Sequence, residues 1–280
     1  MDGKDRCEGA NRMQAEITVK IIVATHKHYR MPEDEMYLPL HVGAEGKNLE
    51  LGYQKDNTGE NISSRNPGFC ELTGLYWAWK NLDEDYIGLV HYRRHFASGK
   101  GKDAWKRILT YKDLKPFLGK VKIFIPRKRR YYIESLYSHY AHTHYSSQLD
   151  ETKGIIAEKY PEYLTSYEKV VRQTYGYMFN MMIMQKNLLD EYCSWLFDIL
   201  FELEKRINMP ELSDFQGRFY GRVSEILFNV WLDRQIVNGN LQSNEIREIP
   251  WICTEKVDWW KKGSAFLRAK FLGKRYEQSV

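Results

Sequence analysis

The sequence predicts an α/β protein built on an open β-sheet, and three observations support this prediction. Residues 19–25, 86–90 and 121–126 form β-branched or apolar runs with the composition of buried strands. Amphipathic helical patterns, with apolar residues three and four positions apart, lie between and after these runs. Each run leads into a polar, partly cationic segment, and ligands of open α/β sheets bind at the carboxyl ends of the strands. We therefore expect a ligand site where these strand ends meet.

Length and composition are those of an ordinary globular protein. The 280 residues, 43% hydrophobic and 28% charged, can bury the core of one large α/β domain or of two small ones. Four scattered cysteines, none in a CxxC pair, argue against a disulfide framework or a zinc site and favour reduced thiols in the cytoplasm. We expect the polar residues 1–16 to form a disordered extension. No apolar run approaches the roughly 20 residues that a membrane-spanning helix needs.

The first predicted strand, residues 19–25, runs directly into a polar turn that contains Thr25, His26 and Lys27. Nucleotides commonly bind at such a turn in Rossmann-like sheets. The turn has no GxGxxG or Walker sequence, so neither a dinucleotide site nor a P-loop is indicated. Further on, residues 56–64 are dense in hydrogen-bonding side chains within a long segment that lacks periodicity. Such a segment is either functional or a mobile surface loop.

A helix is predicted to begin at Asn66, as its capping residue, with Pro67 in its first turn. Its buried face consists of apolar residues at helical spacing: Leu72, Leu75, Tyr76 and Trp79. Glu71, Gly74 and Ala78 share another face, where the small residues would leave room for Glu71 to point into a cleft. The alternative is an exposed first-turn glutamate that complements the helix dipole.

Residues 85–96 combine a predicted strand with a cationic end. Two histidines and two arginines follow the apolar half of this stretch: His91, Arg93, Arg94 and His95. The planar fork of arginine suits phosphate oxygens, so this cluster indicates an anion site, although a solvated basic turn explains it equally well. A second basic cluster, residues 127–130, follows the strand at 121–126 and strengthens the anion interpretation.

Three histidines, His139, His142 and His144, lie close together in the sequence. A zinc site is disfavoured because no clear carboxylate precedes them at helical spacing, so hydrogen bonding to a polar ligand is the stronger hypothesis. Packing against the neighbouring tyrosines is the alternative. Residues 177–184 then have the composition of a buried strand, and residues 188–203 show the apolar spacing of a long amphipathic helix.

The helix predicted at residues 215–232 carries a polar stripe beside its apolar side. The stripe consists of residues spaced by four, three and four: Arg218, Arg222, Glu225 and Asn229. Stripes of this kind are usually solvated ion pairs. If the helix lines a cleft, however, Glu225 is a carboxylate held between arginines, which is one way to place a general base.

The last segment, residues 255–280, is basic and amphipathic. It has seven basic and three acidic residues, a difference of +4, and its aromatic residues share one broad arc of a helical wheel. Aromatic residues combined with lysines predict adsorption to an anionic membrane surface. A helix that docks on the protein's own core is the competing interpretation.

Several linked motifs resemble one bacterial family. They occur in a single order: residues 20–27, 31–32, 41–44, 56–63, 71–81 and 88–94. The family has long been catalogued as a domain of unknown function; it occurs in capsule, exopolysaccharide and O-antigen gene clusters and is associated with galactofuranosyltransferases. The likeness extends from about residue 18 through the basic C-terminal segment.

This resemblance implies a GT-A-like fold, a single domain at residues 17–254 with a mostly parallel central sheet flanked by helices. It also implies transfer of galactofuranose from UDP-galactofuranose to a lipid-diphosphate-linked glycan, with inversion to a β linkage. We expect such an enzyme in the cytoplasm, held at the inner face of the cell membrane by residues 255–280. Many GT-A enzymes hold Mn²⁺ or Mg²⁺ through an Asp-x-Asp pair, but here the equivalent strand ends in His91-Tyr92-Arg93-Arg94. Asp83 and Asp85 lie at its other end and look like turn residues.

We therefore expect no metal cofactor. Arg93 and Arg94, with His91 or Lys27, would stabilise the departing UDP in place of a metal. The remaining donor contacts are assigned to polar residues near the strand ends: Thr25, His26, Asp56, Asn57, Asn61 and Tyr92. Activity that strictly requires Mn²⁺ or Mg²⁺ would contradict this hypothesis.

Glu225 or Glu71 would be the general base, and the sequence does not choose between them. Acceptor contacts are assigned to basic residues of the histidine cluster and the later helix: His142, His144, Arg218 and Arg222. One alternative is a transferase of the same fold that uses UDP-galactose or another nucleotide sugar. An alternative of another class is a basic nucleic-acid-binding or membrane-surface module without catalysis; we expect no nucleic-acid partner, because the basic residues lie at separate strand ends and in the last segment.

Overall fold

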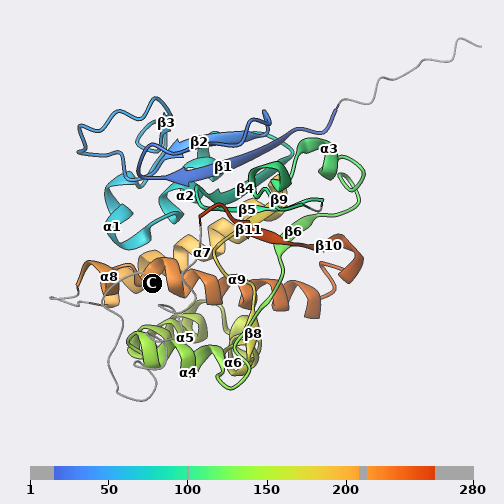
Figure 1. Ribbon diagram of the computed structural model, residues 1–280. Coiled ribbons are helices and arrows are strands. Elements are labelled where there is room, and N and C mark those ends of the chain that lie inside the picture. Colours follow the sequence, from blue (N-terminus) through green and yellow to red (C-terminus); the bar gives the residue numbers. More distant parts are fainter. Residues whose placement is uncertain (1–15, 100, 208–212, 256–280) are drawn as a thin grey trace, which may run out of the picture.

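A computed structural model describes residues 16–99, 101–207 and 213–255 of the chain. In it, a sheet lies over a layer of helices, and further helices cover that layer (Figure 1). The predicted N-terminal extension, apart from residue 16, and the predicted membrane-binding segment beyond residue 255 lie outside the described residues. Those two predictions therefore stay untested.

The central sheet of the described chain has nine strands. Seven follow the order β10-β6-β9-β4-β1-β2-β3, and β11 pairs with β5, which in turn pairs with β4. The strands of this sheet are β1 (Val19–Thr25), β2 (Tyr37–His41), β3 (Gln54–Lys55), β4 (Tyr86–His91), β5 (Arg94–Phe96), β6 (Ile123–Pro126), β9 (Met182–Gln185), β10 (Ile246–Ile249) and β11 (Trp251–Cys253). β1 runs parallel to β2 and β4, whereas β9 runs antiparallel to both β4 and β6. The sheet is mostly parallel, as predicted.

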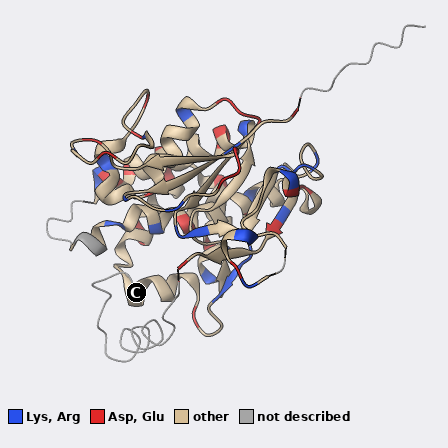
Figure 2. Cartoon of the chain, turned by 45° about the horizontal axis from the view of Figure 1, so that its top comes forward, with Lys and Arg blue, Asp and Glu red and all other residues tan. Residues whose placement is uncertain are grey.

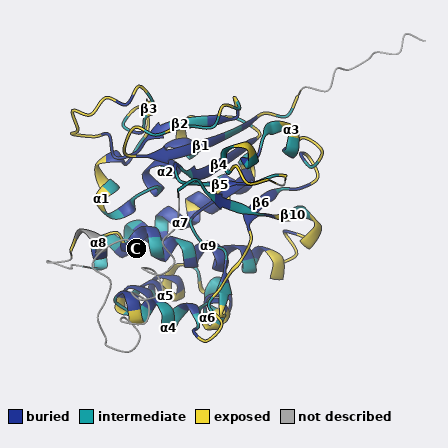
Figure 3. Ribbon diagram, viewed as in Figure 1, coloured by how far each residue is buried: buried dark blue, intermediate teal, exposed yellow. Residues whose placement is uncertain are grey.

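The pleat of β1 explains why this strand is central. Ile22 and Ala24 point to the core on one face of the sheet, while Ile21 and Val23 point to the core on the other. A strand buried on both faces needs a nearly continuous apolar run, which is the signal that predicted it. Figure 3 shows β1 as one of the most deeply buried elements.

Helices on one side of the sheet build the larger core. The helices of the described chain are α1 (Asn66–Phe69), α2 (Leu72–Asn81), α3 (Tyr111–Leu114), α4 (Leu136–Thr143), α5 (Ser147–Lys159), α6 (Leu164–Arg172), α7 (Lys186–Arg206), α8 (Asp214–Gly217) and α9 (Phe219–Val237). α2 and α7 contact the sheet, and α9 contacts α7. α5 packs on α7, and α6 packs on α9. α5 and α6 thus belong to an outer layer of helices (Figure 1).

A helix begins at Asn66 with Pro67 in its first turn, as predicted, but two other local predictions about α1 and α2 are wrong. Asn66 does not cap a single helix: its side-chain amide donates to Cys70 O at 2.8 Å, and Cys70 has a φ of 51° that separates α1 from α2. Gly74 leaves no free space beside Glu71, because a Cβ at this position would lie 2.9 Å from Val42 Cγ1. Its small size instead lets α2 pack closely on the sheet.

β9 begins later than the sequence predicts. Phe179 and Asn180 have φ values of 77° and 51°, which no strand residue adopts, so the ladder starts only at Met182. The segment before it, with the small antiparallel pair β7 (Arg129–Arg130) and β8 (Tyr175–Gly176), connects the sheet to the outer helices.

Charge is spread over the molecule. In the view of Figure 2, Lys and Arg alternate with Asp and Glu over both the sheet and the helices. None of the described helices is sufficiently long and apolar to span a lipid bilayer.

Candidate active site

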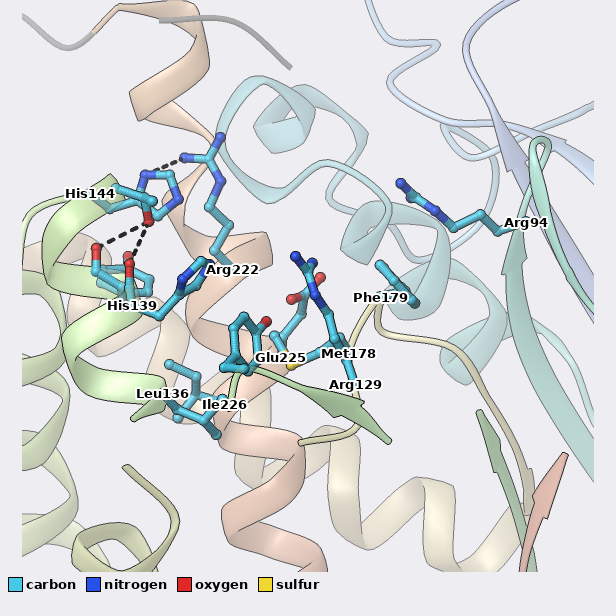
Figure 4. A pocket seen from close by; sticks show the side chains of 13 residues that line it. Arg94, Arg129, Leu136, His139, His144, Met178, Phe179, Arg222, Glu225 and Ile226 are labelled. Atoms are coloured by element: carbon cyan, nitrogen blue, oxygen red, sulfur yellow. Dashed lines mark hydrogen bonds between the residues drawn. The ribbon is translucent and has the colours of Figure 1, made fainter. Parts of the chain in front are cut away.

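A cavity of about 250 Å³ lies between the end of the sheet and the outer helices. Arg94 reaches it from β5, Arg129 from β7, and Glu225 from α9 (Figure 4). The remaining lining consists of aromatic, apolar and imidazole side chains, one threonine and a third arginine, from α9: Tyr131, Leu136, His139, Tyr140, Thr143, His144, Met178, Phe179, Arg222 and Ile226. A partly buried carboxylate therefore shares this space with three arginines.

The electrostatic surroundings of Glu225 are unusual for a glutamate. Burial and the nearby carboxylate of Glu71 raise the pKa of Glu225 to about 7, against the opposing effects of the Phe179 backbone N–H, Arg129 and Arg94. A group with this pKa can accept a proton near neutral pH and is readily deprotonated again. The two carboxylates that the sequence offers as alternative bases therefore lie close enough for the charge of Glu71 to raise the pKa of Glu225.

The turn before β9 fixes this arrangement. His91 Nε2 lies 2.6 Å from Phe179 O, and because a carbonyl oxygen only accepts, the imidazole donates. The Asn180 amide donates to Glu71 Oε1 at 2.7 Å and to Gly221 O at 2.8 Å. Ser224 Oγ donates to Asn180 Oδ1 at 2.9 Å. One turn thus joins the end of β4, the start of α2 and the face of α9 that carries Glu225.

The two neighbouring arginines at the end of β4 point to different places. The Arg94 guanidinium lies 4.6 Å from the centre of the Phe179 ring and lines the cavity. Arg93 forms an ion pair with Glu255 at 3.3 Å, lies 5.2 Å from the Tyr92 ring centre, and keeps 39% of its side chain exposed. The predicted pair of guanidinium groups is therefore divided between the cavity and a neighbouring surface.

That neighbouring surface gathers several predicted donor-binding residues. Lys27 Nζ lies 5.1 Å from the Tyr92 ring centre, and His26 meets the same ring edge-on. Burial, followed by the charges of Lys27 and Arg218, lowers the pKa of His26. Thr25 Oγ1 donates to Lys27 O at 2.7 Å and so holds the turn after β1. Predicted residues from β1, β4 and the start of α9 thus form one cationic surface beside the cavity, although Arg218 itself does not line it.

Asp56 has a different position from the one expected of a donor contact. It is fully buried, and its carboxylate accepts from the backbone N–H groups of Gly43 and Ala44 and from the hydroxyls of Ser63 and Thr73. These four donors occupy its oxygens, so Asp56 orders the surrounding loops and does not present a carboxylate to a ligand.

Asn57 and Asn61 bond within the same loop region. Asn57 donates to Glu45 Oε2 at 3.2 Å, and Asn61 donates to Gly59 O at 2.9 Å while accepting from Ser63 N. All three hydrogen-bonding partners of these two side chains that the structure gives are protein groups of the loop region, which fits a shaping role for residues 56–64.

The histidines surround a carboxylate that the sequence analysis missed. Glu134 is buried and accepts from Nδ1 of His139 at 2.9 Å and of His142 at 2.8 Å. Burial opposes its ionisation, but these hydrogen bonds outweigh that effect and lower the pKa of Glu134. His139 lines the cavity, whereas His142 is exposed and does not. No group of three His, Cys, Asp or Glu side chains in the described chain could hold a metal ion.

His144 and Arg222 lie together at the helical end of the cavity (Figure 4). His144 Nδ1 lies 3.0 Å from Gln216 Oε1, and because an amide oxygen only accepts, the imidazole donates there. The Arg222 guanidinium approaches the same nitrogen, with Nη1 at 3.3 Å. Burial and this neighbouring charge lower the pKa of His144 to about 3, so the ring is neutral. Two of the four predicted acceptor-binding residues thus line the cavity.

Asp85 lies at the opposite end of β4 from the cavity. Its carboxylate accepts from the backbone N–H and the hydroxyl of Thr18, at 2.8 and 2.9 Å. This confirms that Asp85 is a turn residue.

Comparison with known proteins identifies the family of this chain. Residues 20–236 match a family described as a domain of unknown function, DUF4422. The chain belongs to this family. No curated protein matches it.

A solved structure provides a second comparison. The bifunctional glycosyltransferase WbbM, in its apo form, is 30% identical over 85% of this chain, with a TM-score of 0.77. The match covers 46% of the WbbM chain, so this protein spans about half the length of that relative. The fold is accordingly GT-A-like, in a single domain, as the sequence resemblance implied.

Some residues of this DUF4422 site were not singled out from the sequence. Arg129 lines the cavity, but it belongs to a basic cluster, residues 127–130, to which the sequence gave no specific role. His139 also lines the cavity, whereas only His142 and His144 of the histidine cluster were predicted to bind the acceptor. Phe179 and Asn180 are not distinguished in the sequence, because residues 177–184 have the composition of a continuous strand, although both residues adopt positive φ. Asparagine is one of the few non-glycine residues that adopt left-handed backbone conformations readily, so Asn180 could have indicated the turn.

Proposed function

We propose that this protein is an inverting glycosyltransferase of surface-polysaccharide synthesis that transfers galactofuranose from UDP-galactofuranose to a lipid-linked glycan. The 30% identity to a bifunctional glycosyltransferase supports the reaction class. The furanose donor and the lipid-linked acceptor come from the resemblance of the sequence motifs. The observation that carries the mechanism is a partly buried carboxylate, Glu225, with a pKa of about 7 in a cavity lined by arginines.

Glu225 is the proposed general base. Its carboxylate takes the proton of the acceptor hydroxyl, and the freed oxygen attacks the anomeric carbon of the donor sugar. The bond from that carbon to UDP breaks, and its electron pair stays on the β-phosphate oxygen. Inversion follows from a single displacement. Glu71, held by Asn180, assists by raising the pKa of the base and does not itself take the proton.

The leaving diphosphate is the proposed partner of the cations at the strand ends. Arg94 approaches from the cavity, whereas Arg93 and Lys27 approach from the surface around Tyr92. Fixed positive charge aimed at a developing oxyanion is commonly the largest single catalytic contribution. We propose that these groups supply it without a resident metal ion, and that undiminished turnover in EDTA will support this.

The decisive experiment offers the enzyme UDP-galactofuranose and, in parallel, UDP-galactopyranose, each with a panel of lipid-mimetic acceptors. We expect product only with the furanose donor, with a β linkage by NMR. Glu225→Gln is expected to bind donor normally in calorimetry and to lose turnover by about a hundredfold or more. Wild-type turnover in that variant would remove Glu225 from the mechanism, and product from the pyranose donor alone would replace the proposed substrate.

A further inference from the structure

A short turn after β7 exposes two large apolar side chains next to the cavity. Tyr132 and Ile133 are 81% and 74% exposed, more than any other large hydrophobic side chain in the described residues. Adjacent exposed apolar side chains of this size usually mark an interaction site. Neither residue lines the cavity or has a part in the proposed reaction.

The backbone holds these side chains outward. Ile133 N donates to Tyr131 O at 2.7 Å, across Tyr132, whose φ is 59°. A three-residue turn with positive φ at a bulky residue is rare and strained, and such strain persists only where the surroundings impose it. Here both sides are fixed, because Tyr131 N donates to Thr174 O at 2.7 Å and Glu134 is buried among its histidines.

The segment that leads into the turn is strongly basic. Residues 127–130 are Arg127, Lys128, Arg129 and Arg130, all of them exposed. Of these, Lys128 alone forms an ion pair with an acidic residue of the described chain, Glu248, at a long 3.8 Å. The same lysine lies 5.1 Å from the ring centres of both Tyr175 and Tyr177. A run of exposed basic residues thus leads directly into the aromatic and aliphatic tip formed by Tyr132 and Ile133.

We propose that residues 127–133, the docking turn, bind an anionic membrane surface. The apolar tip matches the interfacial region of a bilayer, where tyrosine and aliphatic side chains are favoured, and the basic residues that precede the tip match anionic headgroups. A nucleic acid would use the cations but would leave Ile133 exposed to water. This surface is separate from residues 255–280, so it adds a second membrane contact to the one expected there.

The location of the docking turn gives it a further role, which rests on the proposed function. Arg129 and Tyr131 belong to the same segment and line the cavity. Docking through Tyr132 and Ile133 would therefore bring the cavity next to the lipid surface. An acceptor anchored in that surface would reach Glu225 without leaving the bilayer.

Vesicle flotation of the full chain tests this inference. Binding is measured on phosphatidylcholine vesicles with and without phosphatidylglycerol, for the wild type, for Tyr132→Ser/Ile133→Ser, and for the matched control Ile236→Ser/Val237→Ser. The control removes two other exposed apolar side chains, 42% and 62% exposed, at the end of α9. We expect the docking-turn variant to lose about tenfold in partitioning to the anionic vesicles, and the control to lose none.

Equal partitioning of the two double variants would overturn the proposal, and so would binding that does not depend on phosphatidylglycerol. The result is independent of catalysis, since flotation needs no sugar donor. Vesicle binding without transferase activity would instead refute the proposed function. Turnover of a water-soluble acceptor by the docking-turn variant should equal that of the wild type.

Discussion

Glu225 and Glu71 show at the scale of single residues how a fold changes the chemistry of a common side chain. Burial removes water from the Glu225 carboxylate, and the Glu71 charge disfavours a second anion beside it, so the pKa of Glu225 rises to about 7. Asn180 holds Glu71 in place by a 2.7 Å hydrogen bond. The proton affinity of the proposed base is thus raised first by burial and then by a neighbouring carboxylate that takes no proton from the substrate.

The first prediction concerns the pH dependence of catalysis. Because the base must be ionised, kcat/KM should increase with pH through a value near 7. Glu71→Gln keeps an acceptor for Asn180 but removes the negative charge, so the pKa of Glu225 should fall and the rising limb should move to lower pH. A pH–rate profile of both proteins checks this, and superimposable profiles would contradict the coupling of the two carboxylates.

The second prediction concerns stability at the same residue. The folded-state pKa of Glu225 lies above its ordinary value of 4.5, so the folded protein binds the proton more tightly than the unfolded chain does. This contribution is fully present below pH 4.5 and is lost as pH rises toward 7. Glu225→Gln should therefore raise the free energy of unfolding by about 1–3 kcal/mol at pH 8 and by little at pH 4.5. Denaturant titrations at the two pH values measure this, and an equal change at both would refute the linkage.

At the scale of an element, α2 lies close to the sheet because Gly74 has no side chain. A Cβ at this position would meet Val42 Cγ1 at 2.9 Å and Leu40 Cδ2 at 3.1 Å, both in the core beneath the helix. Helix propensity alone favours alanine over glycine, whereas packing here disfavours any added atom. Since Glu71 precedes the first residue of α2, the position of this helix also sets the position of that carboxylate.

The third prediction compares two helical glycines. Gly74→Ala should destabilise the protein by about 1–3 kcal/mol, because the added methyl group forces α2 away from the sheet. Gly154→Ala, in α5, meets no atom within 4 Å and should stabilise by about 0.5–1 kcal/mol through helix propensity. Urea midpoints of the two variants and the wild type test this pair. Similar changes in the free energy of unfolding for the two variants would show that the close contact with Val42 does not determine the stability of this helix–sheet packing.

At the scale of the whole molecule, the end of β4 divides its cations between two regions. Arg94 faces the cavity between sheet and helices, and Arg93 faces the surface formed by the ends of β1 and β4, next to Glu255. Arg93 lies in the turn between β4 and β5, and Arg94 is the first residue of β5, so one short segment serves both regions. A donor that bridges the two would have its diphosphate next to Arg93 and its sugar next to Glu225.

The fourth prediction separates the two arginines. Arg94→Ala should lower kcat by about a hundredfold, because a cation close to the reacting bond acts mainly in the transition state. Arg93→Ala should chiefly weaken donor binding and so raise KM, with a smaller effect on kcat. Steady-state kinetics with UDP calorimetry distinguishes these outcomes. Equal changes in kcat and KM in the two variants would contradict this division and would mean that both arginines contribute to the same step.

The sequence by itself determined the buried strands β1, β4 and β6, the cationic strand ends and the family. These depend on local patterns: the apolar run of β1, the basic residues after Val90, and motifs in a fixed order. The confirmed strand at residues 19–25 needed no long-range information, because a strand buried on both faces must be apolar throughout.

Only the tertiary structure decided which of these residues share a site. Glu71 and Asn180 are separated by 109 positions, and no local pattern signals that they meet or that they surround Glu225. Burial, hydrogen bonding and neighbouring charge depend on contacts between distant segments. For the same reason Asp56 was indistinguishable in sequence from a ligand-binding carboxylate until its four protein donors became visible. The chain thus encodes its elements locally, whereas the chemistry of its site arises from long-range packing.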